Sequence, residues 1–105
     1  MSKFSEDLAV MQARGLKLKG DRIQFPVYHL DVPIEELNLG VRALNGLKRA
    51  GIFNADELLK EGVDLYKMRN LGIKSIREIK NALLNYSYEH MTEKQKENFW
   101  KEIMG

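Results

Sequence analysis

Apolar residues recur with the three-to-four-residue period of helices through most of the chain, and with a period of two in one short segment. The helical period predicts helices over 5–13, 41–50, 54–60, 75–85 and 92–104, with one short turn over 33–37 and one or two turns over 63–68. The alternating segment, residues 16–27, predicts a small β-hairpin that turns at Gly20 and Asp21. The pattern therefore predicts a mainly α-helical chain with a small N-terminal β element.

Capping residues indicate where these helices begin and end. Side chains suited to an N-cap stand at the start of four of them: Ser5, Asn54, Ser75 and Thr92. The last three are each followed, three residues later, by Glu or Gln, which is the capping-box pattern. Glycines are expected to end three of the helical segments: Gly15, Gly51 and Gly62.

One segment of the sequence occurs twice, at an offset of 32 residues. Residues 39–50 and 71–82 are identical at four positions and similar at five, and each copy begins Leu-Gly-apolar-basic-small-apolar. The glycine is expected to adopt a positive φ and to allow a turn before a helix. The start of a helix carries unpaired amides that bind phosphate, so two copies side by side predict two phosphate-binding helix ends on one face. The alternative is a compact helical pair with exposed charges and no ligand.

The two copies and the residues between them resemble a known family. Residues 32–52, 56–59 and 65–79 are similar, in this order and spacing, to the C-terminal domain of the bacterial RNA polymerase alpha subunit. The resemblance covers residues 32–86. It implies a compact helical domain with two helix-hairpin-helix-like units. It also implies a non-enzymatic, DNA-binding function linked to transcription, in which A·T-rich minor groove is bound and sigma factors and activators are contacted.

The resemblance assigns DNA-binding roles to seven residues. Arg42 matches the arginine that enters the minor groove, where a narrow A-tract concentrates negative potential. Asn45 matches a polar residue one turn later on the same helix. The remaining five match the second hairpin, which holds phosphates, and its supporting contacts: Asn70, Gly72, Lys74, Ser75 and Glu78. Glu78 also has a purely local interpretation, because it completes the capping box with Ser75.

The sequence departs from the family pattern at three positions and keeps part of the pattern at a fourth. Ile73 stands where the family usually has a second lysine, so one phosphate contact is expected to be weaker. Asn38 replaces an acidic residue that contacts sigma, although Glu36 keeps a charge nearby for a protein interface. Gly46 replaces a bulkier residue and lowers helix propensity by about 1 kcal/mol.

The matched segment divides the sequence into three parts. We expect an accessory N-terminal helix and hairpin over 1–30, an RNA polymerase alpha C-terminal-like domain over 31–89 and a C-terminal helix over 90–105. Because the large assembly domain of an alpha subunit does not precede the match, a free-standing domain with added terminal elements is expected. A protein of this length buries enough surface for one core but not for two.

The C-terminal segment carries an apolar cluster with two main interpretations, beside which the pattern leaves open a helix on a membrane surface. Its members are Phe99, Trp100, Ile103 and Met104. The helix either packs back on the domain or on the N-terminal hairpin, or it forms an interface with a protein partner or a second copy of the same chain.

Composition narrows the function further. The 105 residues include no cysteine and two histidines, which excludes thiolate metal sites and a cysteine nucleophile and leaves little for a histidine base. The sequence has no long apolar run and no secretion signal at its start, so we expect a cytoplasmic protein that does not enter membranes and needs no cofactor or metal.

The net charge of +2, from 17 basic and 15 acidic residues, is too small to indicate nucleic-acid binding by itself. Near-neutral charge and Ile73 favour an alternative function. In it, the protein is an interaction module that binds RNA polymerase, sigma or an activator as a regulator or decoy.

Overall fold

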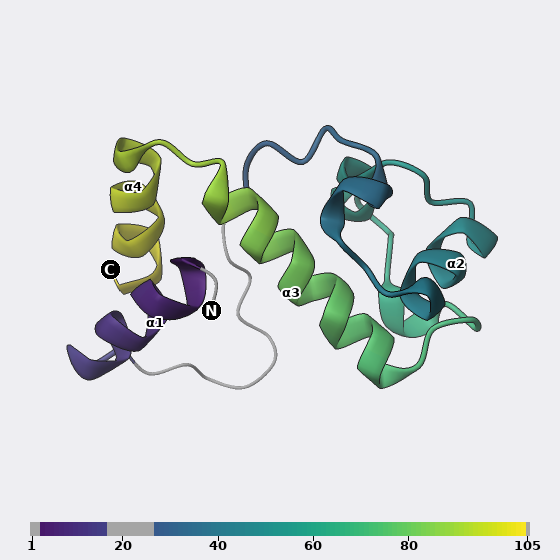
Figure 1. Ribbon diagram of the computed structural model, residues 1–105, viewed down its shortest axis with the longest axis horizontal. Coiled ribbons are helices and arrows are strands. Elements are labelled where there is room, and N and C mark those ends of the chain that lie inside the picture. The colour runs from purple at the N-terminus through teal and green to yellow at the C-terminus, as the bar shows by residue number, and fades with distance from the viewer. Residues whose placement is uncertain (1–2, 17–26, 105) are drawn as a thin grey trace.

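A central helix organises the molecule. The computed structural model describes residues 3–16 and 27–104. In these residues four α-helices and three short 3-10 helices follow one another: α1 (Lys3–Ala13), η2 (Ile34–Leu37), α2 (Val41–Arg49), η3 (Ala55–Leu59), η4 (Leu65–Lys67), α3 (Ile73–Glu89) and α4 (Glu93–Met104). Helix α3 runs through the middle, with α1 and α4 at one end and α2 and the short turns at the other (Figure 1).

The prediction of a mainly helical fold is confirmed. Within residues 3–16 and 27–104 the β structure is limited to a single antiparallel bridge between Pro33 and Asn54. The predicted β-hairpin over 16–27 lies almost entirely outside the described residues. The glycines expected to end α1 and α2 do so: Gly15 and Gly51 have φ of 108° and 81°, values that favour glycine over residues with a Cβ.

The capping predictions had mixed outcomes. At α4 the capping box is present, because Gln95 N donates to Thr92 Oγ1 at 3.1 Å and Thr92 N donates to Gln95 Oε1 at 3.0 Å. Asn54 and Glu57 also form their box, before η3. The N-cap prediction for Ser5 is wrong, because α1 begins at Lys3 and Ser5 lies inside it.

The start and end predicted for α3 are also wrong. Its N-cap is Gly72 rather than Ser75, and the helix runs to Glu89, beyond the predicted end at residue 85. Ser75 is only 8% exposed because it faces the core. The carboxylate of Glu78 has its partner on another element, as described below, so the expected capping box does not form.

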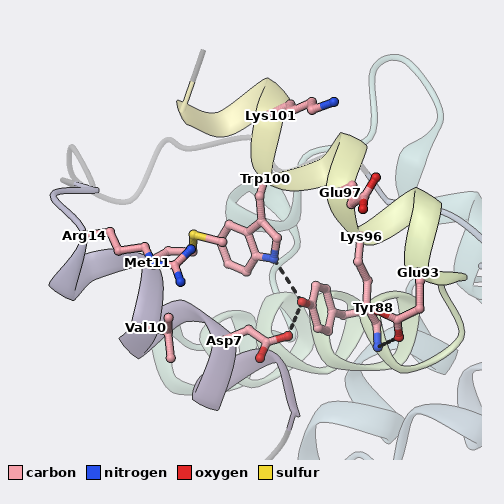
Figure 2. A pocket seen from close by; sticks show the side chains of 10 residues that line it. All are labelled: Asp7, Val10, Met11, Arg14, Tyr88, Glu93, Lys96, Glu97, Trp100 and Lys101. Atoms are coloured by element: carbon pink, nitrogen blue, oxygen red, sulfur yellow. Dashed lines mark hydrogen bonds and ion pairs between the residues drawn. The ribbon is translucent and has the colours of Figure 1, made fainter.

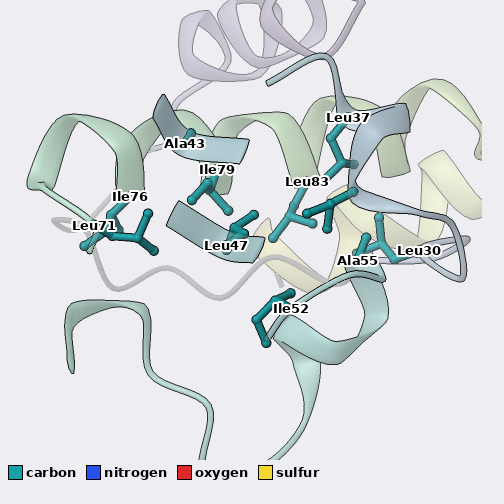
Figure 3. Packing of buried hydrophobic residues seen from close by; sticks show 11 residues of the cluster. Leu30, Leu37, Ala43, Leu47, Ile52, Ala55, Leu71, Ile76, Ile79 and Leu83 are labelled. Carbon is teal, nitrogen blue, oxygen red and sulfur yellow. The ribbon is translucent and has the colours of Figure 1, made fainter. Parts of the chain in front are cut away.

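A first hydrophobic cluster fills the space between α2, the short turns and the N-terminal two-thirds of α3 (Figure 3). Leu47 of α2 and Ile79 of α3 are completely buried in it. Its other buried members are Leu30, Ile34, Leu37, Ala43, Ile52, Ala55, Leu71, Ile76 and Leu83. This cluster holds the two copies of the repeat together.

A second cluster joins α1, α4 and the end of α3. Its buried members are Phe4, Tyr88, Met91, Phe99 and Trp100. The rings meet edge to face or stacked, with the Phe99 and Trp100 centroids 4.9 Å apart. The expectation of one core is therefore wrong. The long helix α3 supports two clusters, since its last turns extend past α2 and present Tyr88 to both terminal helices.

Candidate nucleic-acid interface

The two copies of the repeat occupy equivalent environments. Ala43 and Ser75, at corresponding positions, are both buried, as are Leu47 and Ile79. At each copy the residue after the glycine is the first of its helix. The repeat read from the sequence is therefore a repeat in three dimensions.

Six of the seven predicted DNA-contacting residues, all except Ser75, lie on the solvent side of this pair. Arg42 is the second residue of α2 and Lys74 the second residue of α3, and both are exposed. Asn45, Asn70 and Gly72 are exposed as well. The structure thus leaves the starts of both helices accessible to a ligand.

A reciprocal contact joins the two copies. Glu78 Oε2 of α3 accepts a hydrogen bond at 2.9 Å from the backbone N–H of Gly40, the N-cap of α2. Gly46, which corresponds to Glu78 in the first copy, faces the turn before α3. A Cβ on Gly46 would overlap with Leu71 Cδ2 and lie 3.1 Å from the carbonyl oxygen of Asn70. The same repeat position therefore touches the opposite turn in both directions, as expected for a pseudo-twofold pair.

This contact makes the two helix ends unequal. At α2 the Gly40 amide already has an anionic partner in the Glu78 carboxylate. At both starts the first intrahelical bond is accepted by the glycine, from Leu44 N to Gly40 O and from Ile76 N to Gly72 O, so the amides of residues 41–43 and 73–75 alike have no acceptor within their helices. A Cβ on Gly72 would meet nothing within 4 Å. The two starts therefore differ in what lies beside the glycine, which is the Glu78 carboxylate at α2 and open space at α3.

The glycines before the two helices do not have the backbone conformation that the sequence suggested. Gly40 and Gly72 have φ of −64° and −81°, so the predicted positive φ is wrong at both. These glycines are not needed for a left-handed turn. At Gly72 the missing side chain instead leaves open space beside the start of α3.

The remaining predicted residues are distributed over the molecule. Ser75 is largely withdrawn from solvent, which leaves its backbone amide at the helix start. Glu36 is exposed on η2. Phe99 and Trp100 are buried inside the protein and Ile103 is half-buried against them. The burial of this apolar cluster favours packing of α4 on α1 over an interface with another molecule.

Sequence reasoning missed the role of Gly46, which it treated only as a weak helix former. The signal that would have found it is the repeat itself. Gly46 stands where the second copy has Glu78, and a contact made by one position of a pseudo-twofold pair is expected at its counterpart.

Comparison with known proteins agrees with this geometry. A family model for the C-terminal domain of the alpha subunit of bacterial RNA polymerase matches residues 27–85, more than half of the sequence. The protein belongs to this family. The "DNA-directed RNA polymerase subunit alpha" of Alkaliphilus oremlandii (strain OhILAs) is 53% identical over 55 residues, which is 51% of this protein and 17% of the relative. That of Staphylococcus aureus (strain Newman) is also 53% identical over 55 residues, 18% of its length. The protein thus spans less than a fifth of these relatives.

All seven predicted DNA-contacting residues lie within the part that matches the RNA polymerase alpha C-terminal domain family, as do η2, α2, η3 and η4. Helices α1 and α4 lie outside it. The second cluster is therefore an addition to the matched domain, built on the last turns of α3.

A groove lies on this added part, between α1 and α4 (Figure 2). At its base Trp100 Nε1 donates to Tyr88 Oη at 2.9 Å, and Tyr88 Oη donates to the Asp7 carboxylate. Burial and the Asp7 hydrogen bond raise the pKa of Tyr88, so its hydroxyl stays protonated as this donor. Both acidic and basic side chains line the groove. The described residues contain no cluster of His, Cys, Asp or Glu suited to a metal ion, and none of their helices is long and apolar enough to cross a membrane.

The bond between Glu78 and Gly40 gives a first testable prediction. Replacing Glu78 by alanine removes the acceptor and is expected to cost about 1 kcal/mol of the free energy of unfolding. Glu78→Gln keeps an oxygen acceptor and is expected to lose less than half as much. Urea denaturation of both variants measures the difference. Equal losses would mean that the bond to Gly40 does not hold the start of α2.

Proposed function

We propose that the protein binds double-stranded DNA in connection with transcription, with Arg42 in the minor groove of an A·T-rich tract. The observation that carries this proposal is the contact pair at Glu78 and Gly46. It fixes the starts of α2 and α3 side by side, with Arg42 and Lys74 exposed on them. Such a face presents two helix starts to one ligand.

Minor-groove binding by Arg42 follows from electrostatics. A narrow A·T-rich groove has an enhanced negative potential that attracts an inserted guanidinium. Arg42 stands at the second position of α2, and Glu78 anchors that helix through Gly40. Asn45, three residues later, lies on the same side of α2 and is available to the groove edge.

Phosphate binding is assigned mainly to the start of α3. The amides of residues 73–75, the Lys74 ammonium and the space beside Gly72 together favour close approach of a phosphate. With roughly three to five phosphate contacts in all, the slope of log K against log salt is expected to be about −3 to −4.5. Shape and charge would then dominate over sequence.

Fluorescence anisotropy tests this proposal. An A·T-rich and a G·C-rich duplex are titrated with the wild type, Arg42→Ala and Arg49→Ala at two salt concentrations. Arg49 is the matched control, because it ends α2 and is exposed there. The wild type is expected to prefer the A·T duplex, and Arg42→Ala to raise its Kd about ten-fold and to remove the preference. Arg49→Ala is expected to keep the preference.

Two results would contradict the proposal. One is the absence of salt-sensitive binding by the wild type at tens of micromolar protein. The other is an Arg42→Ala variant that behaves like Arg49→Ala.

A second candidate function is a protein-interaction module that binds RNA polymerase, sigma or an activator. The observation that favours it is the exposure of apolar side chains at both helix starts, 75% for Val41 and 63% for Ile73. Apolar side chains gain more from a protein surface than from a phosphate backbone. Co-purification with RNA polymerase that is lost in Val41→Ser and Ile73→Ser, while DNA binding is absent, would favour this function.

A further inference from the structure

The two copies of the repeat carry very different charge. Segments 35–45 and 67–77 correspond at the offset of 32 residues. The first has a net charge of −1, from Glu35, Glu36 and Arg42. The second has a net charge of +4 and no acidic residue, from Lys67, Arg69, Lys74 and Arg77. The net charge of the whole protein is close to neutral, yet its second hairpin is strongly basic.

These four cations are available to a ligand. All are exposed. In the described part of the protein the ion pairs join Lys3 to Asp7, Lys48 to Glu35 and Lys96 to Glu93, and none of them includes a cation of segment 67–77. The Glu78 carboxylate, next to Arg77 in sequence, accepts from the Gly40 amide instead. The second hairpin therefore presents basic side chains that no described acidic group neutralises by a direct contact.

The repeat fixes where Arg77 lies. Arg77 corresponds to Asn45, just as Lys74 corresponds to Arg42. Lys74 and Arg77 are three residues apart on α3, and Ile73 and Arg77 are four apart, so the three share one side of the helix. Long side chains on a helix lie over the turn before their own Cα. The Arg77 side chain is therefore expected to extend toward the start of α3, beside the uncharged Ile73.

We propose that Arg77 is a phosphate-contacting residue of the DNA interface, supported by Arg69 in the turn before α3. The second copy is then the half that binds the backbone, and the first copy, with Arg42, is the half that reads the groove. This inference rests on the DNA-binding function proposed above. A guanidinium suits the role, because its planar fork donates two parallel hydrogen bonds to a phosphate.

The salt dependence of binding tests the role of Arg77. Arg77→Gln and Arg49→Gln remove the same charge and group from exposed positions, at the start of α3 and at the end of α2. Kd is measured by anisotropy from about 50 to about 300 mM salt on the A·T-rich and G·C-rich duplexes. Arg77→Gln is expected to reduce the magnitude of the salt slope by about 1 and to weaken binding to both duplexes about five- to ten-fold at about 0.1 M salt. Arg77→Lys is expected to keep most of the slope.

The outcomes separate this inference from the proposed function. If Arg77→Gln and Arg49→Gln bind alike while Arg42→Ala loses the A·T preference, the role of Arg77 is wrong and the proposed function stands. If Arg77→Gln changes the A·T preference rather than the slope, Arg77 reads the groove and the phosphate assignment is wrong. If the wild type shows no salt-sensitive binding, the role of Arg77 and the proposed function are both wrong. Thermal melting checks that the variants are folded, because an exposed substitution is expected to change stability by less than about 0.5 kcal/mol.

Discussion

Replacing Phe99 by alanine is expected to destabilise the second cluster by about 3–5 kcal/mol. Phe99 is completely buried, and its ring lies 6.0 Å from Phe4, 5.5 Å from Tyr88 and 4.9 Å from Trp100, between centroids. Its removal leaves a cavity among rings that come from α1, α3 and α4. The neighbouring rings are attached to these helices, so they can fill the cavity only if a helix moves.

The loss is expected to be local. We propose that residues 31–89, apart from the last turns of α3, fold as a unit around the first cluster. Trp100 is the one tryptophan of the sequence and lies in the second cluster, so its fluorescence reports on that cluster alone. In Phe99→Ala, urea is expected to change the Trp100 fluorescence well before the far-UV circular dichroism of the remaining helices. DNA binding through Arg42 is expected to change less than two-fold.

Phe53→Ala is the matched control, because Phe53 is 60% exposed and lies before η3, away from the second cluster. It is expected to change stability by less than about 1 kcal/mol. A Phe99→Ala variant that unfolds in one transition by both probes, and loses DNA binding with it, would mean that the two clusters form a single cooperative unit.

Features set by residues near one another in sequence were predictable. The box between Thr92 and Gln95 spans one helical turn, and the structure forms it as the sequence indicated. The repeat in the sequence is also a repeat in the structure, because corresponding residues of two similar helices, such as Leu47 and Ile79, face the same core. Family membership followed from the same residues, since both hairpins and their spacing agreed.

Ser75 and Glu78 show why other features were not predictable. Their spacing is the same as that of Thr92 and Gln95, yet Glu78 binds the Gly40 amide, 38 residues away in sequence. A local pattern gives a side chain one candidate partner, whereas the folded protein offers others. Here burial of Ser75 in the core and the nearby start of α2 decide between them. The inequality of the two helix ends depends on this choice and so could not be predicted from local patterns.

The second cluster was unpredictable for a related reason. Phe4 and Phe99 lie at opposite ends of the sequence, and no periodic pattern connects them. The aromatic residues near the C-terminus indicated that α4 must cover something apolar. Helix α3 is long enough to carry Tyr88 beyond the family-matched part. This length alone determines that α4 packs with α1.

Gly46→Val is expected to lower the free energy of unfolding by about 2–3 kcal/mol, because a side chain there meets atoms that have little room to move. The first atom of that side chain would overlap with Leu71 Cδ2, on a buried leucine, and lie 3.1 Å from a backbone oxygen of Asn70. Valine gains little helix propensity over glycine, so the clash dominates. Because the turn before α3 must move, DNA affinity is expected to fall as well. Urea denaturation and anisotropy measure the two effects.

Gly72→Val separates the two effects, because the same substitution is made where a Cβ meets nothing and φ is ordinary. It is expected to cost at most about 1 kcal/mol, through the weaker N-cap. Its DNA affinity is nevertheless expected to fall, since the added methyl groups occupy the space where a phosphate approaches α3. If instead Gly72→Val binds DNA like the wild type, the open end of α3 is not the phosphate site. If Gly46→Val is as stable as the wild type, the contact of Gly46 with the turn before α3 does not set the distance between the two copies. The pair of variants thus distinguishes a glycine that permits packing from a glycine that permits binding.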